Sequence, residues 1–207
     1  WVGETDFGTG SEARVAVDRS DHPHVVFKTV DNKIAYLRHN GTAWSTPVYI
    51  ESVPWGKCSK PDIAVDADGY AHVTYTDTDA SSGAYIDYPD IMHAVNSSGD
   101  FVPTLIYDGY YESRLAPNRF GHYYNKGSRI AVDGVGNYYI LTHHLDQYRN
   151  DDEKYTKNTY QILLNSDRAF GIVGTTYSTD GQDIFDIDFD GINVVAFYKT
   201  SYRKTTS

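Results

Sequence analysis

Residues 108–129 carry the strongest chemical signal in the chain. Their net charge is +2, from four cations against two carboxylates, in a chain whose net charge is −10. Six aromatic or histidine side chains are interspersed among these charges. Guanidinium groups pair with carboxylate or sulfate groups, and aromatic rings stack on sugar rings. The segment therefore predicts a site for an acidic carbohydrate, and the alternative is that its arginines pair with neighbouring Asp and Glu. The cations are Arg114, Arg119, Lys126 and Arg129, and the carboxylates are Asp108 and Glu112.

Some of these residues are also suited to acid–base chemistry. β-Elimination of a uronate needs a cation that neutralises the carboxylate and a base that removes the α-proton. We assign Arg119 as the candidate cation and His122, Tyr123 and His143 as the candidates for proton transfer. The candidates for holding the substrate are Tyr110, Tyr111, Arg114, His144, Tyr148 and Arg149.

The histidines have two further interpretations. Three of them, His122, His143 and His144, form a possible zinc ligand set. Adjacent residues of a strand point to opposite faces, so His143 and His144 reach one site only if the strand has ended before them. Otherwise they are structural.

The elements that would position these residues come from a repeated phrase. The phrases "ARVAVDRSDHPHVVF" from Ala13, "PDIAVDADGYAHVTY" from Pro61 and "SRIAVDGVGNYYILT" from Ser128 alternate apolar and polar residues on both sides of a turn. A degenerate copy, "FDIDFDGINVVAFY", follows near the end of the sequence. Each phrase is typical of a β-hairpin. The aspartates that end the first strands, Asp18, Asp66, Asp133 and Asp190, are 48, 67 and 57 residues apart.

A second phrase follows each of the first three hairpins and adds two more strands, with Trp44, Phe101 or Phe170 opening the last. Four antiparallel strands in ~50 residues are typical of a β-propeller blade. We therefore predict an all-β fold, a single propeller domain over residues 1–207 of about four blades. The expected blades span about 11–52, 59–109, 127–178 and 182–207, with residues 1–8 closing the last blade.

Two alternative architectures remain open. A β-sandwich also has short regular strands, although it rarely repeats one phrase. The chain is alternatively a fragment of a larger propeller. In either propeller, the connections at 76–90, 108–128 and 143–159 are the long ones, and we expect all three on one face. Long connections in compact domains are often functional, so this face is the predicted site.

The composition of the chain argues against several classes of binding partner. The net charge of −10 argues against nucleic acid, because it leaves little basic surface to displace counterions from phosphates. No apolar run approaches about 18 residues, so we expect no membrane association. Cys58 is the single cysteine, which excludes an intrachain disulfide. We expect no cofactor, although zinc at the histidines and calcium at residues 66–69 stay open; a hairpin turn also explains the latter.

The repeated "IAVD…G…HV" hairpin resembles secreted BNR-like propellers, including polysaccharide lyases of the ulvan lyase type. The segment "HYYNKGSRIAVDGVGNYYILTHH" is similar to their pattern of one His before the first strand and another after the second. The resemblance implies that His122 and His143 flank the sugar, with a Tyr and an Arg from the same rim. It also implies a secreted or extracellular location. Such lyases are larger than this chain, and the sialidase Asp-box is absent.

Three functions follow from these observations. The first is an extracellular propeller that recognises carbohydrate, most suitably an acidic polysaccharide. The second is a lyase that acts by β-elimination on uronate-containing glycans. The third is a structural module that self-assembles in an extracellular filament or adhesin.

Overall fold

The structure, a computed structural model, consists of β-strands and the turns between them. It describes residues 8–50, 57–78, 89–107, 109, 111–116, 119–149, 154–165, 172–177, 185–191 and 193–198. Within these residues there is no α-helix, and hence no helix that could cross a membrane. The described part is therefore all-β.

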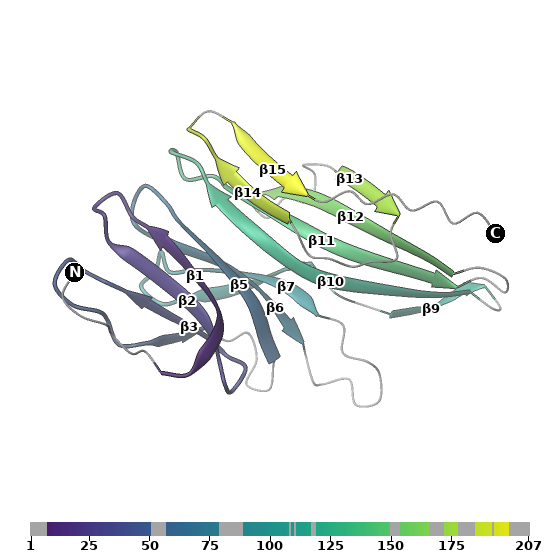
Figure 1. The fold of residues 1–207 in the computed structure, drawn as a ribbon, viewed down its shortest axis with the longest axis horizontal. Helices are drawn as coiled ribbons and strands as arrows, with labels where there is room; N and C mark the ends of the chain where they lie inside the picture. The colour runs from purple at the N-terminus through teal and green to yellow at the C-terminus, as the bar shows by residue number, and fades with distance from the viewer. Residues whose placement is uncertain are drawn as a thin grey trace.

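Two four-stranded antiparallel sheets form the first half (Figure 1). In each, the strands lie in sequence order. The first sheet contains β1 (Gly10–Val17), β2 (Pro23–Thr29), β3 (Ile34–Arg38) and β4 (Val48–Ile50). The second contains β5 (Lys57–Val65), β6 (Ala71–Thr78), β7 (Asp90–Val95) and β8 (Val102–Tyr107).

The second half holds a longer sheet and a hairpin. The third sheet has the strand order β13-β12-β11-β10-β9, and its long strands extend beyond the other sheets on the right of Figure 1. Its strands are β9 (Tyr111–Ala116), β10 (Arg119–Val132), β11 (Tyr138–Arg149), β12 (Lys154–Leu164) and β13 (Ile172–Tyr177). The hairpin pairs β14 (Phe185–Phe189) with β15 (Val194–Tyr198).

The repeated aspartate explains why each phrase forms a hairpin. In the second sheet, Asp66 Oδ1 accepts hydrogen bonds from the backbone N–H groups of Asp68 and Tyr70, at 2.9 and 2.8 Å. Asp18 and Asp133 bind the equivalent N–H groups of their own turns. Such side-chain bonds to the backbone stabilise the tight turn. The turn at residues 66–69 is thus held by its own aspartate.

Successive sheets pack through apolar clusters. Val26, Ile34 and Tyr36 of the first sheet are buried with Val73 and Tyr75 of the second. Further clusters join the second sheet to the third and the third to the final hairpin. Burial of each large apolar side chain contributes ~1.5–3 kcal/mol. The cluster between the second and third sheets comprises Ile91, Ile106, Ile130, Ile140 and Leu163, and the cluster at the final hairpin comprises Ala131, Leu141, Tyr160, Ile162 and Ile187.

Two of the three connections expected to be long loops are largely strand. Residues 108–128 contain β9 and most of β10, and residues 143–159 lie largely in β11 and β12. The prediction of loops there was wrong because backbone pairing between β10 and β11 continues from Val132 back to Phe120. The third connection, 76–90, lies mainly outside the described residues, as do residues 1–7 and 199–207. Closure of a last blade by residues 1–8 therefore stays a prediction, and so does the number of blades.

Candidate functional site: a basic pocket where the innermost strands meet

The first strands of the four hairpins lie next to one another. β1 contacts β5, β5 contacts β10, and β10 contacts β14. All four line one cavity of about 300 Å³, to which β14 contributes Asp186 and Asp188 and β5 contributes Asp62. The first strands of the four hairpins therefore meet around this common cavity, and we call them the innermost strands.

Charged residues alternate in sign around this centre. The position four residues before each turn aspartate is occupied in order by Arg14, Asp62, Arg129 and Asp186. Arg14 Nε lies 3.7 Å from Asp62 Oδ1, and the charges of Arg129, Arg14 and Asp186 all act on the Asp62 carboxyl. The alternation lets cations and carboxylates of neighbouring strands compensate each other.

Asp62 is the most deeply buried member of this set. Its Oδ2 accepts a hydrogen bond of 2.9 Å from the backbone N–H of Ile130, which ties β5 to β10. Burial raises the pKa of the Asp62 carboxyl to about 6, while that hydrogen bond and the charges of Arg129 and Arg14 act in the lowering direction. Desolvation disfavours the ionised form and outweighs these contacts.

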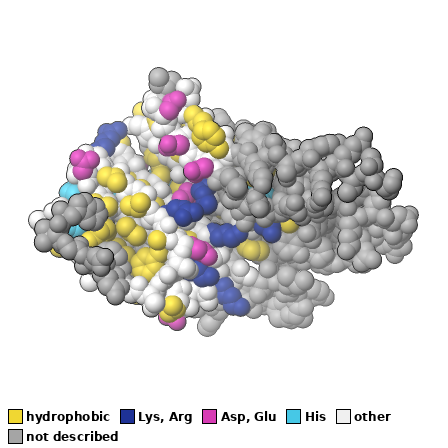
Figure 2. Space-filling model, in the orientation of Figure 1, with side chains coloured by type: hydrophobic (Ala, Val, Ile, Leu, Met, Phe, Trp, Pro, Cys, Tyr) yellow, Lys and Arg dark blue, Asp and Glu magenta, His cyan; other side chains and the backbone are white. Residues whose placement is uncertain are grey.

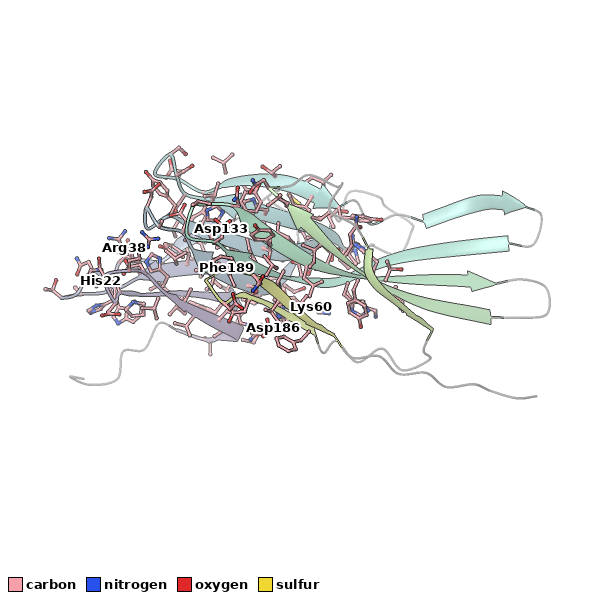
Figure 3. The ribbon with its side chains drawn as sticks, turned by 90° about the horizontal axis from the view of Figure 1, so that it is seen from above. His22, Arg38, Lys60, Asp133, Asp186 and Phe189 are labelled. Carbon is pink, nitrogen blue, oxygen red and sulfur yellow. The ribbon has the colours of Figure 1, made fainter. Side chains whose placement is uncertain are left out.

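A basic pocket of about 260 Å³ is lined by residues of three of these strands, β1, β5 and β10. It is lined by four cationic side chains and one carboxylate, a balance of +3 in a chain of −10. Figure 2 shows Lys and Arg side chains gathered in the middle of one face, and Figure 3 shows Lys60 near the middle of the molecule. The charged lining residues are Glu12, Arg14, Lys60, Lys126 and Arg129.

The backbone around the pocket is irregular at one repeat position. The register shifts between Ser59 and Asp62, and Lys60 has a φ of +53°. Glu12 and Gly127 occupy the same repeat position at shifts of their own, with φ of +57° and +145°. A β-bulge redirects a side chain, and a left-handed conformation costs a non-glycine residue about 1 kcal/mol or more. Three strands thus accept bulges where they line the pocket.

Contacts between the strands hold this arrangement. The backbone N–H of Lys60 donates to Glu12 Oε2, which connects β5 to β1. The Lys60 Nζ group donates to the carbonyl oxygen of Lys126, which connects β5 to β10. The pocket is therefore built by contacts between three strands and not by a single loop.

Buried histidines form a second polar cluster, next to the aspartates of the hairpin turns. His72 Nε2 lies 3.3 Å from Asp66 Oδ2, and its Nδ1 lies 3.2 Å from His93 Nε2. In the first sheet His24 connects Asp18 to Tyr36 in the same way, at 3.5 and 2.8 Å. Burial lowers the pKa of His93 to about 3, with the charge of His72 as the smaller cause. These neutral, enclosed histidines stabilise the hairpins.

His143 and His144 are also enclosed. His143 is 0% exposed and stacks on Tyr160, and His144 is 5% exposed. His144 Nδ1 lies 2.6 Å from Asn125 Oδ1, and its Nε2 lies 2.7 Å from Thr142 Oγ1. Burial lowers the pKa of His144 to about 3, with the charge of His143 as a further cause. This environment favours a structural role for both residues, and their predicted roles at a substrate remain predictions.

The other predicted site residues lie on adjacent strands at the far end of the third sheet. His122 is paired with Tyr111 of β9 and with Gln147 of β11. His143 is four positions from Gln147 along β11, so the backbones of His122 and His143 are separated by ~13 Å. The structure thus places the backbones of Tyr111 and His122 side by side, and the predicted role of His143 beside them stays a prediction. Arg119 and Tyr123 lie on β10 with His122, whereas Arg114 lies on β9, and Tyr148 and Arg149 lie on β11. Tyr110 lies outside the described residues.

Sequence reasoning missed most of the residues of the basic pocket. Lys126 and Arg129 were noted for their charge, but Glu12, Arg14 and Lys60 were not. The available signal was the phase of the repeat, because Arg14 and Arg129 precede their turn aspartates by four residues each. Among the described residues, no three His, Cys, Asp or Glu side chains gather as metal ligands.

Comparisons with known proteins place the chain near two kinds of solved structure. No protein-family model and no curated protein matches it. A Hadza microbial sialidase superposes with a TM-score of 0.43 at 11% identity, over 81% of this chain and 46% of the sialidase. A polysaccharide lyase, an ulvan lyase solved alone and bound to GlcA(1-4)Rha3S units, superposes with a TM-score of 0.46 at 9% identity, over 86% of this chain and 58% of the lyase. The chain thus spans about half the length of these structures.

Proposed function

We propose that the chain is an extracellular β-propeller module that binds an anionic glycan at the basic pocket. The observation that carries this proposal is the set of four cations around one carboxylate where three innermost strands meet. Clustered Lys and Arg side chains give charge-assisted hydrogen bonds to carboxylate and sulfate groups. Because the chain is acidic overall, this local balance of +3 is not a consequence of composition.

The size of the pocket defines what part of the glycan it would take. Its volume of about 260 Å³ is below the ~300–1,000 Å³ typical of sites that enclose a small molecule. It therefore suits a charged substituent and part of one sugar ring. A longer chain would continue over the surface, and β10 leads from Lys126 and Arg129 towards the region of Tyr111 and His122.

The backbone strain supports a binding role over a purely structural one. Lys60 keeps a left-handed conformation that glycine would adopt at lower cost. Strained non-glycine residues cluster at ligand sites, where side-chain position outweighs stability. Lys60 donates to a backbone carbonyl of β10 while lining the pocket, so its ammonium group is held in place beside the site.

The test compares two lysines of the same strand. Lys60 lines the pocket, whereas Lys57 is exposed and does not. Calorimetric titration with a uronate polysaccharide, a sulfated polysaccharide and a neutral polysaccharide should show binding of one or both anionic polymers only. Lys60→Gln should weaken that binding roughly tenfold, because one charge-assisted hydrogen bond is lost. Lys57→Gln should leave it unchanged.

Two outcomes would contradict the proposal. Equal binding of the neutral polymer would show that the cations are not used. Equal losses in the two variants would show that the surface attracts polyanions without using the pocket. Added salt should weaken the binding of the anionic polymers, since partly exposed charges are screened.

A further inference from the structure

Asp62 faces the cations that an anionic ligand would use. Its carboxyl oxygens contact Arg14 Nε at 3.7 Å and the backbone N–H of Ile130 at 2.9 Å. The side chain is 12% exposed, whereas that of Arg14 is 44% exposed and reaches the pocket. Asp62 therefore lies behind the pocket and shares Arg14 with it.

The charged groups around Asp62 come from four strands. β1 contributes Glu12 and Arg14, β10 contributes Lys126 and Arg129, β14 contributes Asp186 and Asp188, and β5 itself contributes Lys60. On β6 the residue opposite Asp62 is Thr74, which carries no charge. No histidine lines the basic pocket or the adjoining cavity among the described residues. Asp62 is thus the side chain best placed to couple this site to protons near neutral pH.

We propose that Asp62 makes anion binding at the basic pocket proton-linked. The ionised carboxylate competes with the ligand for Arg14 and Arg129, and the protonated carboxyl releases both cations to the ligand. This inference rests on the proposed function, because it needs an anion to occupy the pocket. It makes Asp62 a positioning residue that acts through the two arginines.

The direction of the coupling follows from the site. Burial raises the pKa of Asp62 to about 6 in the free protein. A bound anion adds negative charge beside the carboxyl, which raises this pKa further. Binding therefore takes up a proton at and above this pH, and affinity increases as the pH falls.

The experiment uses inorganic sulfate, whose charge does not change over the relevant range. Calorimetric titration at constant ionic strength should show sulfate binding roughly tenfold more tightly at about pH 5 than at about pH 7.5. Titrations near pH 6.5 in two buffers of different ionisation enthalpy should show a fraction of a proton taken up per sulfate bound. Both measurements use the unaltered chain, so they test the proton linkage of anion binding even if a variant does not fold.

A matched pair of substitutions isolates Asp62. Asp62→Asn keeps an acceptor for the Ile130 N–H and should bind sulfate at about pH 7.5 as tightly as the unaltered chain does at about pH 5, without pH dependence. Asp68→Asn changes an exposed carboxylate in the adjacent turn and should preserve the pH dependence. Identical pH dependence in Asp62→Asn would overturn the inference.

The remaining outcomes separate the two proposals. Sulfate binding that is independent of pH and takes up no proton would overturn the role of Asp62 and leave the anion pocket intact. Absence of binding by sulfate and by the anionic polysaccharides at both pH values would overturn the proposed function and this inference with it. A uronic acid titrated in parallel shows whether carboxylate replaces sulfate at the pocket.

Discussion

The innermost strands carry one repeated sequence pattern, and their two ends differ in whether the repeated residue type is constant. At the turn end, Asp18, Asp66 and Asp133 keep one residue type and make the same backbone contacts. Four residues earlier, the type alternates between Arg and Asp, and six residues earlier three of the strands bulge. The aspartate that stabilises the hairpin turn is thus constant, whereas the residue type at the position that faces the centre varies. We conclude that the turn end stabilises the fold, and we propose that the opposite end forms the binding site.

The largest expected effect is at the turn end. Asp66→Ala removes the acceptor of two backbone N–H groups and of the buried His72 ring. At about 1 kcal/mol for each hydrogen bond, and more for a buried donor left without its acceptor, we expect a loss of ~2–4 kcal/mol in the free energy of unfolding. Urea denaturation measures this loss. Asp68→Ala, in the same turn but exposed, should change stability by less than ~0.5 kcal/mol, and equal losses in the two variants would contradict the role of Asp66.

A smaller effect of opposite sign is expected at the site end. The Asp62 pKa is raised from 3.8 to about 6, so the folded state binds more protons than the unfolded state between these values. Its contribution to the free energy of unfolding is therefore greatest below about pH 4, decreases as the pH rises to about 6, and is constant above that. Asp62→Asn should raise the free energy of unfolding by ~1–3 kcal/mol at about pH 7.5.

The informative quantity is the difference in the free energy of unfolding between Asp62→Asn and the unaltered chain. Urea unfolding at several pH values should show this difference growing from about pH 4 to about pH 6 and then staying constant. A variant that is less stable at about pH 7.5 would mean that the contacts of Asp62 with Arg14 and Ile130 outweigh the cost of its burial. The two ends would then both serve stability.

The smallest effect on stability is expected at Lys60, where a substitution should change anion binding and leave folding nearly unchanged. Lys60→Gly relieves a left-handed φ of +53°, although glycine also gains freedom in the unfolded chain. We expect a free energy of unfolding that is unchanged or higher by up to ~1 kcal/mol, together with a roughly tenfold loss of anion affinity. Urea denaturation and sulfate titration of the same preparation measure both. A stability loss above ~1 kcal/mol without a change in affinity would assign Lys60 to the fold alone.

The hairpins could be predicted from the sequence because apolar and polar residues alternate on both sides of each turn. This alternation around Asp66 has the period of two that is typical of a β-strand, although β6 is buried at seven of its eight positions. The outer parts of β10 and β11 were missed because residues 119–127 mix aromatic, charged and glycine residues without that period. Backbone pairing of β10 with β11 defines them as strands.

The candidate site was harder to predict, for a related reason. Its cations come from β1, β5 and β10, which are far apart in the sequence, so composition windows see only Lys126 and Arg129 together. Aligning the repeats on their turn aspartates exposes the alternation of Arg14, Asp62, Arg129 and Asp186. The bulge at Lys60 leaves no sequence signal, because the residue there is not glycine.

A crystal structure with a bound uronate or sulfated disaccharide tests the central claim most directly. The account predicts that the acidic group occupies the basic pocket, within about 3 Å of Lys60 and Arg129, with the second sugar directed along β10. It would be contradicted by a disaccharide held at the far end of the third sheet, at Arg119, His122 and Tyr123, with the basic pocket empty.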